Sequence, residues 1–145
     1  MSKHQVKFEQ FFAVPREKVF AYFSDHEKFG KVLGIRCRRI RDGADTRDVN
    51  GLGSVREIRM AGMKFEETIT KFESPIVIEY QVTRGSPIKN HLGRLVFTDE
   101  PGGTHLTYTI SFDPKIPGTG GLIAGILNTG WCKGRDRAVK AIAAA

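Results

Sequence analysis

The sequence predicts an α+β fold in which an antiparallel β-sheet is covered by a long C-terminal helix, with two short helices after the first strand. Seven stretches alternate apolar and polar residues, which is typical of strands with one buried face. Successive strands that are joined by short turns must be antiparallel. Only residues 120–145 are long enough for a substantial helix, and a sheet with one apolar face needs such a cover.

The first part of the chain predicts one strand and two short helices. Residues 3–13 alternate apolar and polar side chains and form the strand. Pro15 suits the first turn of a helix because its missing N–H costs nothing there. Ser24 or Asp25 can cap a second helix, and Gly34 ends it. The buried stripes are Val19, Phe20 and Phe23 on the first helix and Phe29, Val32 and Leu33 on the second.

The chain after the second helix predicts a run of six strands. They are expected over residues 35–41, 54–61, 63–73, 76–83, 89–99 and 104–113. The polar loop 42–53 contributes no core residue, and Gly62, Ser74-Pro75 and Pro101-Gly102-Gly103 mark turns. No internal repeat or low-complexity tract interrupts this order, so residues 1–145 are expected to form a single domain.

The C-terminal segment combines a helical apolar pattern with four glycines. The apolar residues recur every three to four positions: Ile123, Ile126, Leu127, Trp131, Ala138, Ala141, Ile142 and Ala145. Gly121, Gly125, Gly130 and Gly134 lie within this pattern, although glycine costs about 1 kcal/mol against alanine inside a helix. Either the glycines allow close packing against a neighbouring element, or they leave open volume beneath the helix. Trp131 is expected in the core.

The net charge of +7 is concentrated in one region of the chain. The excess comes from Arg36, Arg38, Arg39, Arg41, Arg47, Arg56 and Arg59. A basic patch can bind phosphate groups. However, acidic residues lie among the arginines, and no RNA-reading motif or aromatic platform accompanies them. The pattern therefore favours a solvated sheet face and leaves a nucleic-acid partner open.

Cysteine usage and the N-terminus predict a cytoplasmic protein. Cys37 and Cys132 are far apart in the sequence and are expected to be reduced. Residues 1–10 lack the apolar run of a signal peptide. Residues 116–132 hold too many glycines and polar side chains for a membrane span. The four histidines are scattered, so we expect no metal site and no cofactor.

Several short motifs, taken in order, resemble those of one known family. They are Val14-Pro15 leading into Val19–Asp25, the glycine-rich entry Gly51–Arg56, and the hairpin segments Gly93-Arg94-Leu95 and Pro101–Tyr108. With the order of elements, they make nearly the whole chain similar to the helix-grip fold of the START-like (SRPBCC) superfamily. That superfamily includes the birch pollen major allergen, steroidogenic lipid-transfer domains and bacterial polyketide cyclase/dehydrase-like proteins. Where many relatives carry Trp-x-Pro near the pocket mouth, this chain has Phe29-Gly30-Lys31-Val32.

The resemblance implies a cavity between the curved sheet and the long helix, which takes molecules such as lipids, sterols, quinones or aromatic polyketides. The expected ligand-binding residues are Arg56, Phe65, Ile78, Tyr80, His91, Phe97, Tyr108, Ile110, Phe112, Ile126 and Gly130. Most of them are apolar, as in ligand pockets generally, and the few polar groups, with Asn128 as a further candidate, would orient a ligand.

The polar candidates also have structural interpretations. Tyr80 and Tyr108 can be core residues whose hydroxyls reach the rim. His91 either points inward or is exposed at the start of its strand. Arg56 needs a partner if it is buried, and Glu67 has the parity to be that partner. The other histidines, His4, His26 and His105, are expected at the surface.

The sequence contains none of the Gly-x-Ser-x-Gly, HExxH, P-loop or Rossmann motifs. Our first hypothesis is a protein that binds, or transports, a small hydrophobic ligand such as a lipid, quinone or aromatic polyketide. The alternative is an enzyme of the polyketide cyclase or dehydratase type, with Arg56, Tyr80, His91 and Tyr108 as proton-transfer or carbonyl-orienting groups. A third hypothesis is an interaction module that uses the arginine cluster against RNA, the ribosome or another acidic surface.

Overall fold

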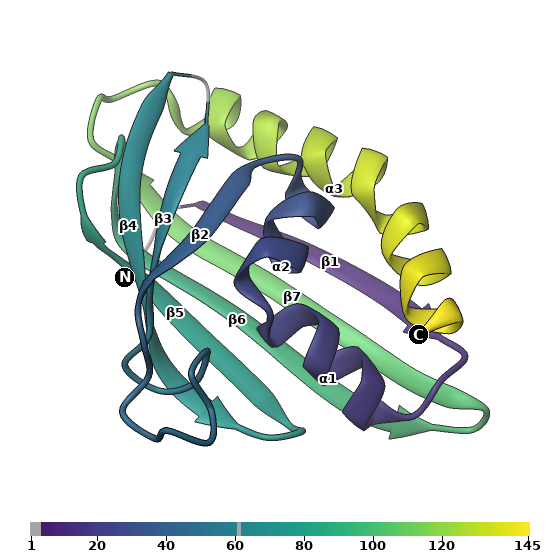
Figure 1. The fold of residues 1–145 in the computed structure, drawn as a ribbon. Coiled ribbons are helices and arrows are strands. Elements are labelled where there is room, and N and C mark those ends of the chain that lie inside the picture. Colours follow the sequence, from purple (N-terminus) through teal and green to yellow (C-terminus); the bar gives the residue numbers. More distant parts are fainter. Residues whose placement is uncertain (1–3, 61) are drawn as a thin grey trace.

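A computed structural model of the chain describes residues 4–60 and 62–145, which form a seven-stranded antiparallel sheet with three helices (Figure 1). The strands are β1 (His4–Phe12), β2 (Arg36–Arg41), β3 (Val55–Met60), β4 (Met63–Glu73), β5 (Val77–Arg84), β6 (Ile88–Glu100) and β7 (Gly103–Pro114). The helices are α1 (Arg16–Ser24), α2 (His26–Leu33) and α3 (Gly120–Ala144). The predicted order of elements is confirmed. Lys3 and Ala61, at the ends of two predicted strands, lie outside the described residues.

The sheet follows the chain except at its first strand. Its spatial order is β1-β7-β6-β5-β4-β3-β2, so β1 pairs with the last strand and β2 forms the opposite edge. The sheet curves around the helices, and α3 packs on α2 and β1 (Figure 1). No helix within residues 4–60 and 62–145 combines the length and apolar character that crossing a bilayer requires.

The second short helix begins and ends at the residues that the sequence indicates, whereas Pro15 precedes α1 as its N-cap and does not lie in its first turn. The Oδ1 atom of Asp25 accepts a hydrogen bond from the backbone N–H of Lys28 at 3.1 Å, so Asp25 rather than Ser24 caps α2. Gly34 ends α2 with a left-handed backbone, at φ 71°, which a glycine adopts without strain. The position of α2 is therefore defined at both ends, and its buried face turns towards β2 and α3.

Aromatic side chains form much of the core between the sheet and the helices. The indole of Trp131 stacks on the ring of Phe8, with centroids 4.9 Å apart and planes 9° apart. Phe97 contacts Phe20 and Phe23 edge-on or tilted, which links β6 to α1. The prediction that Trp131 is a core residue is confirmed, because only 3% of its surface is exposed.

The glycines of α3 fall into two groups. A Cβ at Gly130 or Gly134 would overlap the carbonyl oxygen of Leu33 or Val32 respectively, because α2 lies against the helix backbone there. The hypothesis of open volume is therefore wrong at these two positions, and close packing is correct. A Cβ at Gly121 or Gly125 would meet no atom within 4 Å.

One expected ligand-binding residue and one strand boundary differ from the prediction. Ile126 is 40% exposed, because Ile123 and Leu127 are the α3 residues that turn towards the sheet in this part of the helix. The strand expected over residues 76–83 begins at Val77 instead, and Ile76 belongs to the turn before it and is 47% exposed.

The two glycine groups predict opposite effects of the same substitution. We expect Gly134→Ala to lower the free energy of unfolding by about 1–3 kcal/mol, since the methyl group forces α2 and α3 apart. Gly125→Ala, on the exposed side of the same helix, should raise it by up to about 1 kcal/mol through helix propensity. Urea unfolding of both variants measures the two effects. Equal changes in the two variants would contradict the close contact between α2 and α3.

Candidate functional site

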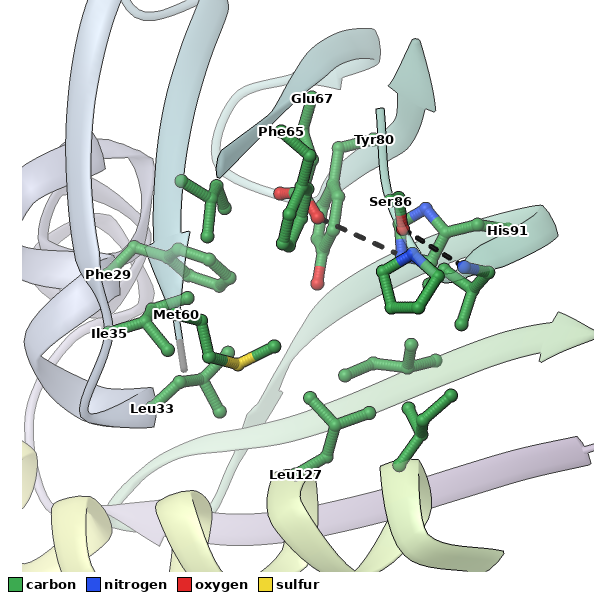
Figure 2. Close-up of a pocket in the computed structure, with 15 residues that line it drawn as sticks. Phe29, Leu33, Ile35, Met60, Phe65, Glu67, Tyr80, Ser86, His91 and Leu127 are labelled. Atoms are coloured by element: carbon green, nitrogen blue, oxygen red, sulfur yellow. Dashed lines mark hydrogen bonds and ion pairs between the residues drawn. The ribbon is translucent and has the colours of Figure 1, made fainter. Parts of the chain in front are cut away.

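A narrow cavity lies between the curved sheet and the N-terminal half of α3 (Figure 2). It encloses about 50 Å³. Its lining is mostly apolar and comes from α2, α3 and the chain between them: Phe29, Leu33, Ile35, Ile58, Met60, Phe65, Glu67, Tyr80, Ser86, Pro87, Ile88, His91, Ile110, Ile123 and Leu127. An engineered protein cavity that binds benzene has roughly 150 Å³, so this cavity must widen to admit a ring.

The polar end of the cavity is built around a buried ion pair. Arg56 and Glu67 lie directly opposite each other in the pairing of β3 with β4. The Nε atom of Arg56 donates to Oε1 of Glu67 at 2.9 Å, with only 2% and 7% of the two side chains exposed. The predicted pairing of Arg56 with Glu67 is confirmed. Burial disfavours the charge on Arg56, but the carboxylate of Glu67 raises the pKa of the guanidinium above its usual value, so the guanidinium stays charged.

Aromatic rings surround the guanidinium group. Its central carbon lies 4.0 Å from the ring centroid of Phe29 and 4.3 Å from that of Tyr80, within the range of cation–π attraction. Although Nη2 of Arg56 lies 2.8 Å from Oε1 of Glu67, its hydrogens are poorly aligned. Among the described residues, Nη2 therefore has no hydrogen-bond partner. Arg56 is held by charge and ring contacts as much as by hydrogen bonds.

His26 supports the guanidinium from α2. Its Nδ1 atom lies 3.4 Å from Nη1 of Arg56 and its Nε2 atom 3.0 Å from the hydroxyl of Ser54. Because arginine is only a donor, Nδ1 accepts and Nε2 carries the proton. Burial and the nearby Arg56 lower the pKa of His26 to about 3. The prediction that His26 lies at the surface is wrong, since only 2% of it is exposed.

His91 faces Glu67 from β6. Its Nδ1 atom accepts a hydrogen bond from the backbone N–H of Val82 at 3.0 Å, so the neutral ring carries its proton on Nε2. Burial lowers the pKa of His91, although the charge of Glu67 acts in the opposite direction. Because the pKa is lowered overall, the ring is neutral near pH 7. Nε2 lies 4.0 Å from Oε2 of Glu67, too far for a direct hydrogen bond (Figure 2). Of the two predicted placements of His91, the inward one is correct.

Two tyrosines complete the polar group. The hydroxyls of Tyr80 and Tyr108 are hydrogen-bonded to each other, and burial raises the pKa of both well above the usual value. Both hydroxyls are therefore neutral near pH 7, and one donates to the other. The ring of Tyr80 lies across Gly93 of β6, where any Cβ would overlap it. A glycine at this position thus allows Tyr80 to reach both Arg56 and the cavity.

The expected ligand-binding residues separate into four groups. Phe65, Tyr80, His91 and Ile110 line the cavity. Arg56 and Tyr108 lie behind it, in contact with Tyr80. Ile78, Phe97 and Phe112 are buried elsewhere along the inner face of the sheet. Ile126 and Gly130 line an outer groove instead, and Asn128 is exposed.

Sequence reasoning missed several cavity residues. Glu67 was identified only as a partner for Arg56, although its carboxylate also lines the cavity. Met60, Ile123 and Leu127 line it from β3 and α3. Strand parity and helical spacing identify which face these residues occupy, but the place where α3 crosses the sheet carries no comparable sequence signal.

The arginine cluster is smaller than its sequence suggests. Arg56 is buried, whereas Arg36, Arg38, Arg39, Arg41, Arg47 and Arg59 are exposed. Several of them pair with acids: Arg38 and Arg59 lie 3.4 and 3.1 Å from Oε1 of Glu57, and Arg39 pairs with Asp42 at 2.9 Å. In the described part of the chain, no group of three His, Cys, Asp or Glu side chains is arranged to hold a metal ion.

The chain belongs to the family described as polyketide cyclase / dehydrase and lipid transport, whose sequence model matches residues 3–145. The resemblance to the SRPBCC superfamily that the motifs indicated is thereby confirmed. A search of curated protein sequences finds no significant match.

Solved structures with the same fold confirm the helix-grip architecture. A protein from Mesorhizobium loti is 15% identical, with a TM-score of 0.71 over 94% of this chain and 95% of that chain. The protein Ara h 8.0201 is 15% identical, with a TM-score of 0.66 over 98% of this chain and 99% of its own. Truncated norcoclaurine synthase from Thalictrum flavum is 11% identical, with a TM-score of 0.67 over 94% and 90%.

The buried state of His26 predicts a loss of stability in mild acid. The unfolded chain binds a proton at this imidazole below about pH 6.5, whereas the folded chain does not until the pH approaches 3. Lowering the pH from 7 to 5.5 should therefore reduce the free energy of unfolding by about 1 kcal/mol through His26 alone.

The variant His26→Gln isolates this contribution, because Gln keeps a polar side chain but does not titrate. Urea unfolding at both pH values should show a smaller acid-induced loss in the variant than in the unmodified protein. Equal losses would contradict the buried, neutral state of His26.

Proposed function

We propose that the protein binds a small, mostly apolar molecule that carries a hydroxyl group, with the apolar body in the cavity and the hydroxyl between Glu67 and His91. The observation that carries this proposal is the 4.0 Å gap between Oε2 of Glu67 and Nε2 of His91. One atom is an acceptor and the other a donor, and they face each other across a gap too wide for a direct bond. A hydroxyl oxygen placed between them donates to Glu67 and accepts from His91.

The rest of the cavity lining suits the apolar part of the proposed ligand. Apart from Glu67, His91, Tyr80 and Ser86, the side chains that line the cavity are apolar. Ligand pockets typically combine such a lining with a few polar groups that fix orientation. Membership of a family described by lipid transport, and a fold shared with norcoclaurine synthase and Ara h 8.0201, agree with hydrophobic-ligand binding.

The cavity must widen when a ligand enters, and Met60 and Leu127 are the side chains best suited to move. Met60 lies at the end of β3 beside the turn to β4, and its unbranched side chain adapts readily to a new shape. Leu127 lines the cavity from α3 and is only partly buried. Widening at these two positions leaves the ion pair and the aromatic core in place.

Substituting two adjacent residues of α3 tests the proposal. Ile123 lines the cavity, whereas its neighbour Leu122 is 69% exposed. Ile123→Trp should fill the cavity, and Leu122→Trp should leave it open. Native mass spectrometry with added 2-naphthol, a small aromatic alcohol, should show one bound molecule in the unmodified protein and in Leu122→Trp. For Ile123→Trp we expect affinity to fall at least about tenfold, or roughly 1.4 kcal/mol.

Circular dichroism shows whether both variants keep the fold. If folded Ile123→Trp and Leu122→Trp bind 2-naphthol equally well, the ligand does not occupy this cavity. Native mass spectra of the protein as purified show whether a natural ligand accompanies it. Extraction of that ligand then gives its chemical class.

A further inference from the structure

We propose that the ligand is an amphipathic anion, whose charged group binds Lys133 and Arg137 at the entrance while its apolar body enters the cavity. This inference rests on the proposed function and adds a charge requirement to it. The proposed anion site is a groove on the outside of the cavity wall, and neither the ion pair nor the inner polar groups line it.

The groove lies where the end of α2 and the tip of β3 meet α3. It has a volume of about 240 Å³, whereas the cavity next to it has about 50 Å³. Four residues line both spaces: Leu33, Ile35, Met60 and Leu127. In Figure 2, Leu33, Ile35 and Met60 lie together opposite Leu127 of α3. These four side chains form the partition, so a molecule that moves them apart passes from the groove into the cavity.

The groove has an apolar floor and a basic rim. Ile126 and the four partition residues supply the apolar surface, and Lys133 and Arg137 supply the charge. The two cations are four residues apart on α3 and thus share one face of the helix. No acidic residue is among the described residues that line the groove, and neither cation forms an ion pair within the described chain.

Three exposed arginines of β2 and β3 differ from this pair, because each lies 2.9–3.4 Å from a carboxylate oxygen. Arg38 and Arg59 share Glu57, and Arg39 pairs with Asp42. Lys133 and Arg137 instead repel each other mildly across one helical turn. An anion bound between them removes that repulsion, and an apolar chain attached to it covers Ile126 and Leu127. A carboxylate, sulfate or phosphate on an apolar body fits this arrangement.

The test compares two ligands that share an apolar chain with a terminal hydroxyl and differ in charge at the other end. 10-Hydroxydecanoate carries a carboxylate there, and 1,10-decanediol carries a second hydroxyl. Isothermal titration calorimetry with the full-length protein at neutral pH should show 10-hydroxydecanoate binding at least about fivefold tighter than 1,10-decanediol, as expected for two exposed charge contacts. The preference should fall as salt is added, because the contacts are near the surface.

A double substitution with a matched control locates the charge recognition. Lys133→Gln with Arg137→Gln should abolish the preference for 10-hydroxydecanoate and leave the affinity for 1,10-decanediol unchanged. Arg135→Gln with Lys140→Gln removes the same charge from exposed positions on the same helix that do not line the groove. This control should keep the preference.

Three outcomes would overturn the inference. The first is equal affinity of the unmodified protein for 10-hydroxydecanoate and 1,10-decanediol, which would leave the proposed function intact. The second is an equal loss of preference in the two double variants, which would indicate net charge rather than the groove. The third is binding to phosphatidylglycerol vesicles without binding of free 10-hydroxydecanoate, which would indicate bilayer docking. If neither 10-hydroxydecanoate, 1,10-decanediol nor 2-naphthol binds, the proposed function itself fails.

Discussion

The ion pair between Arg56 and Glu67 is the interaction on which the cavity depends. Two buried charges are costly unless each is paired, and removing one partner of such a pair typically costs about 3–5 kcal/mol. Here the register of β3 with β4 places the two residues opposite each other. The rings of Phe29 and Tyr80 then contact the guanidinium. The pair therefore links α2, β3, β4 and β5 at one point on the inner face of the sheet.

The same ion pair gives the cavity its chemical character. With one oxygen of Glu67 occupied by Arg56, the other faces His91, whose Nδ1 atom is already bonded to the backbone of β5. A carboxylate acceptor and an imidazole donor are thus fixed at the end of an apolar space. Because both groups are buried and anchored, they are oriented before any ligand arrives, which reduces the ordering cost of binding. The mobile parts of the site are at the other end, near Met60 and Leu127.

Much of the fold follows from local patterns in the sequence. Alternation identifies the strands, Asp25 and Gly34 bound α2, and Trp131 falls on the buried side of α3. Strand parity also pairs Arg56 with Glu67, because both must face inward. The burial of His26 had a signal that was not used. It precedes Phe29 by three residues and Leu33 by seven, so it shares their face of α2.

The exact position of the cavity has no such local signal. Ile78, Phe97 and Phe112 have the same inward orientation as the cavity residues, yet they are buried elsewhere, where Phe97 packs on Phe20 and Phe112 on the half-buried His4. Parity determines the face of a strand but not which part of that face a helix covers. The glycines of α3 were equally ambiguous, because close packing on α2 and an open cavity both require small residues. Only the tertiary contact between Gly134 and Val32 decides between them.

The most direct test of the account is a measurement on the two buried imidazoles. Long-range ¹H–¹⁵N NMR spectra resolve the ring nitrogens of His26 and His91 in the free protein and after addition of 2-naphthol or naphthalene. A hydroxyl held between Glu67 and His91 should shift the Nε2 resonance of His91 with 2-naphthol far more than with naphthalene. His26, bonded to Ser54 and Arg56, should change little with either compound. Equal shifts of His91 with the two compounds, or no shift with bound 2-naphthol, would contradict the account.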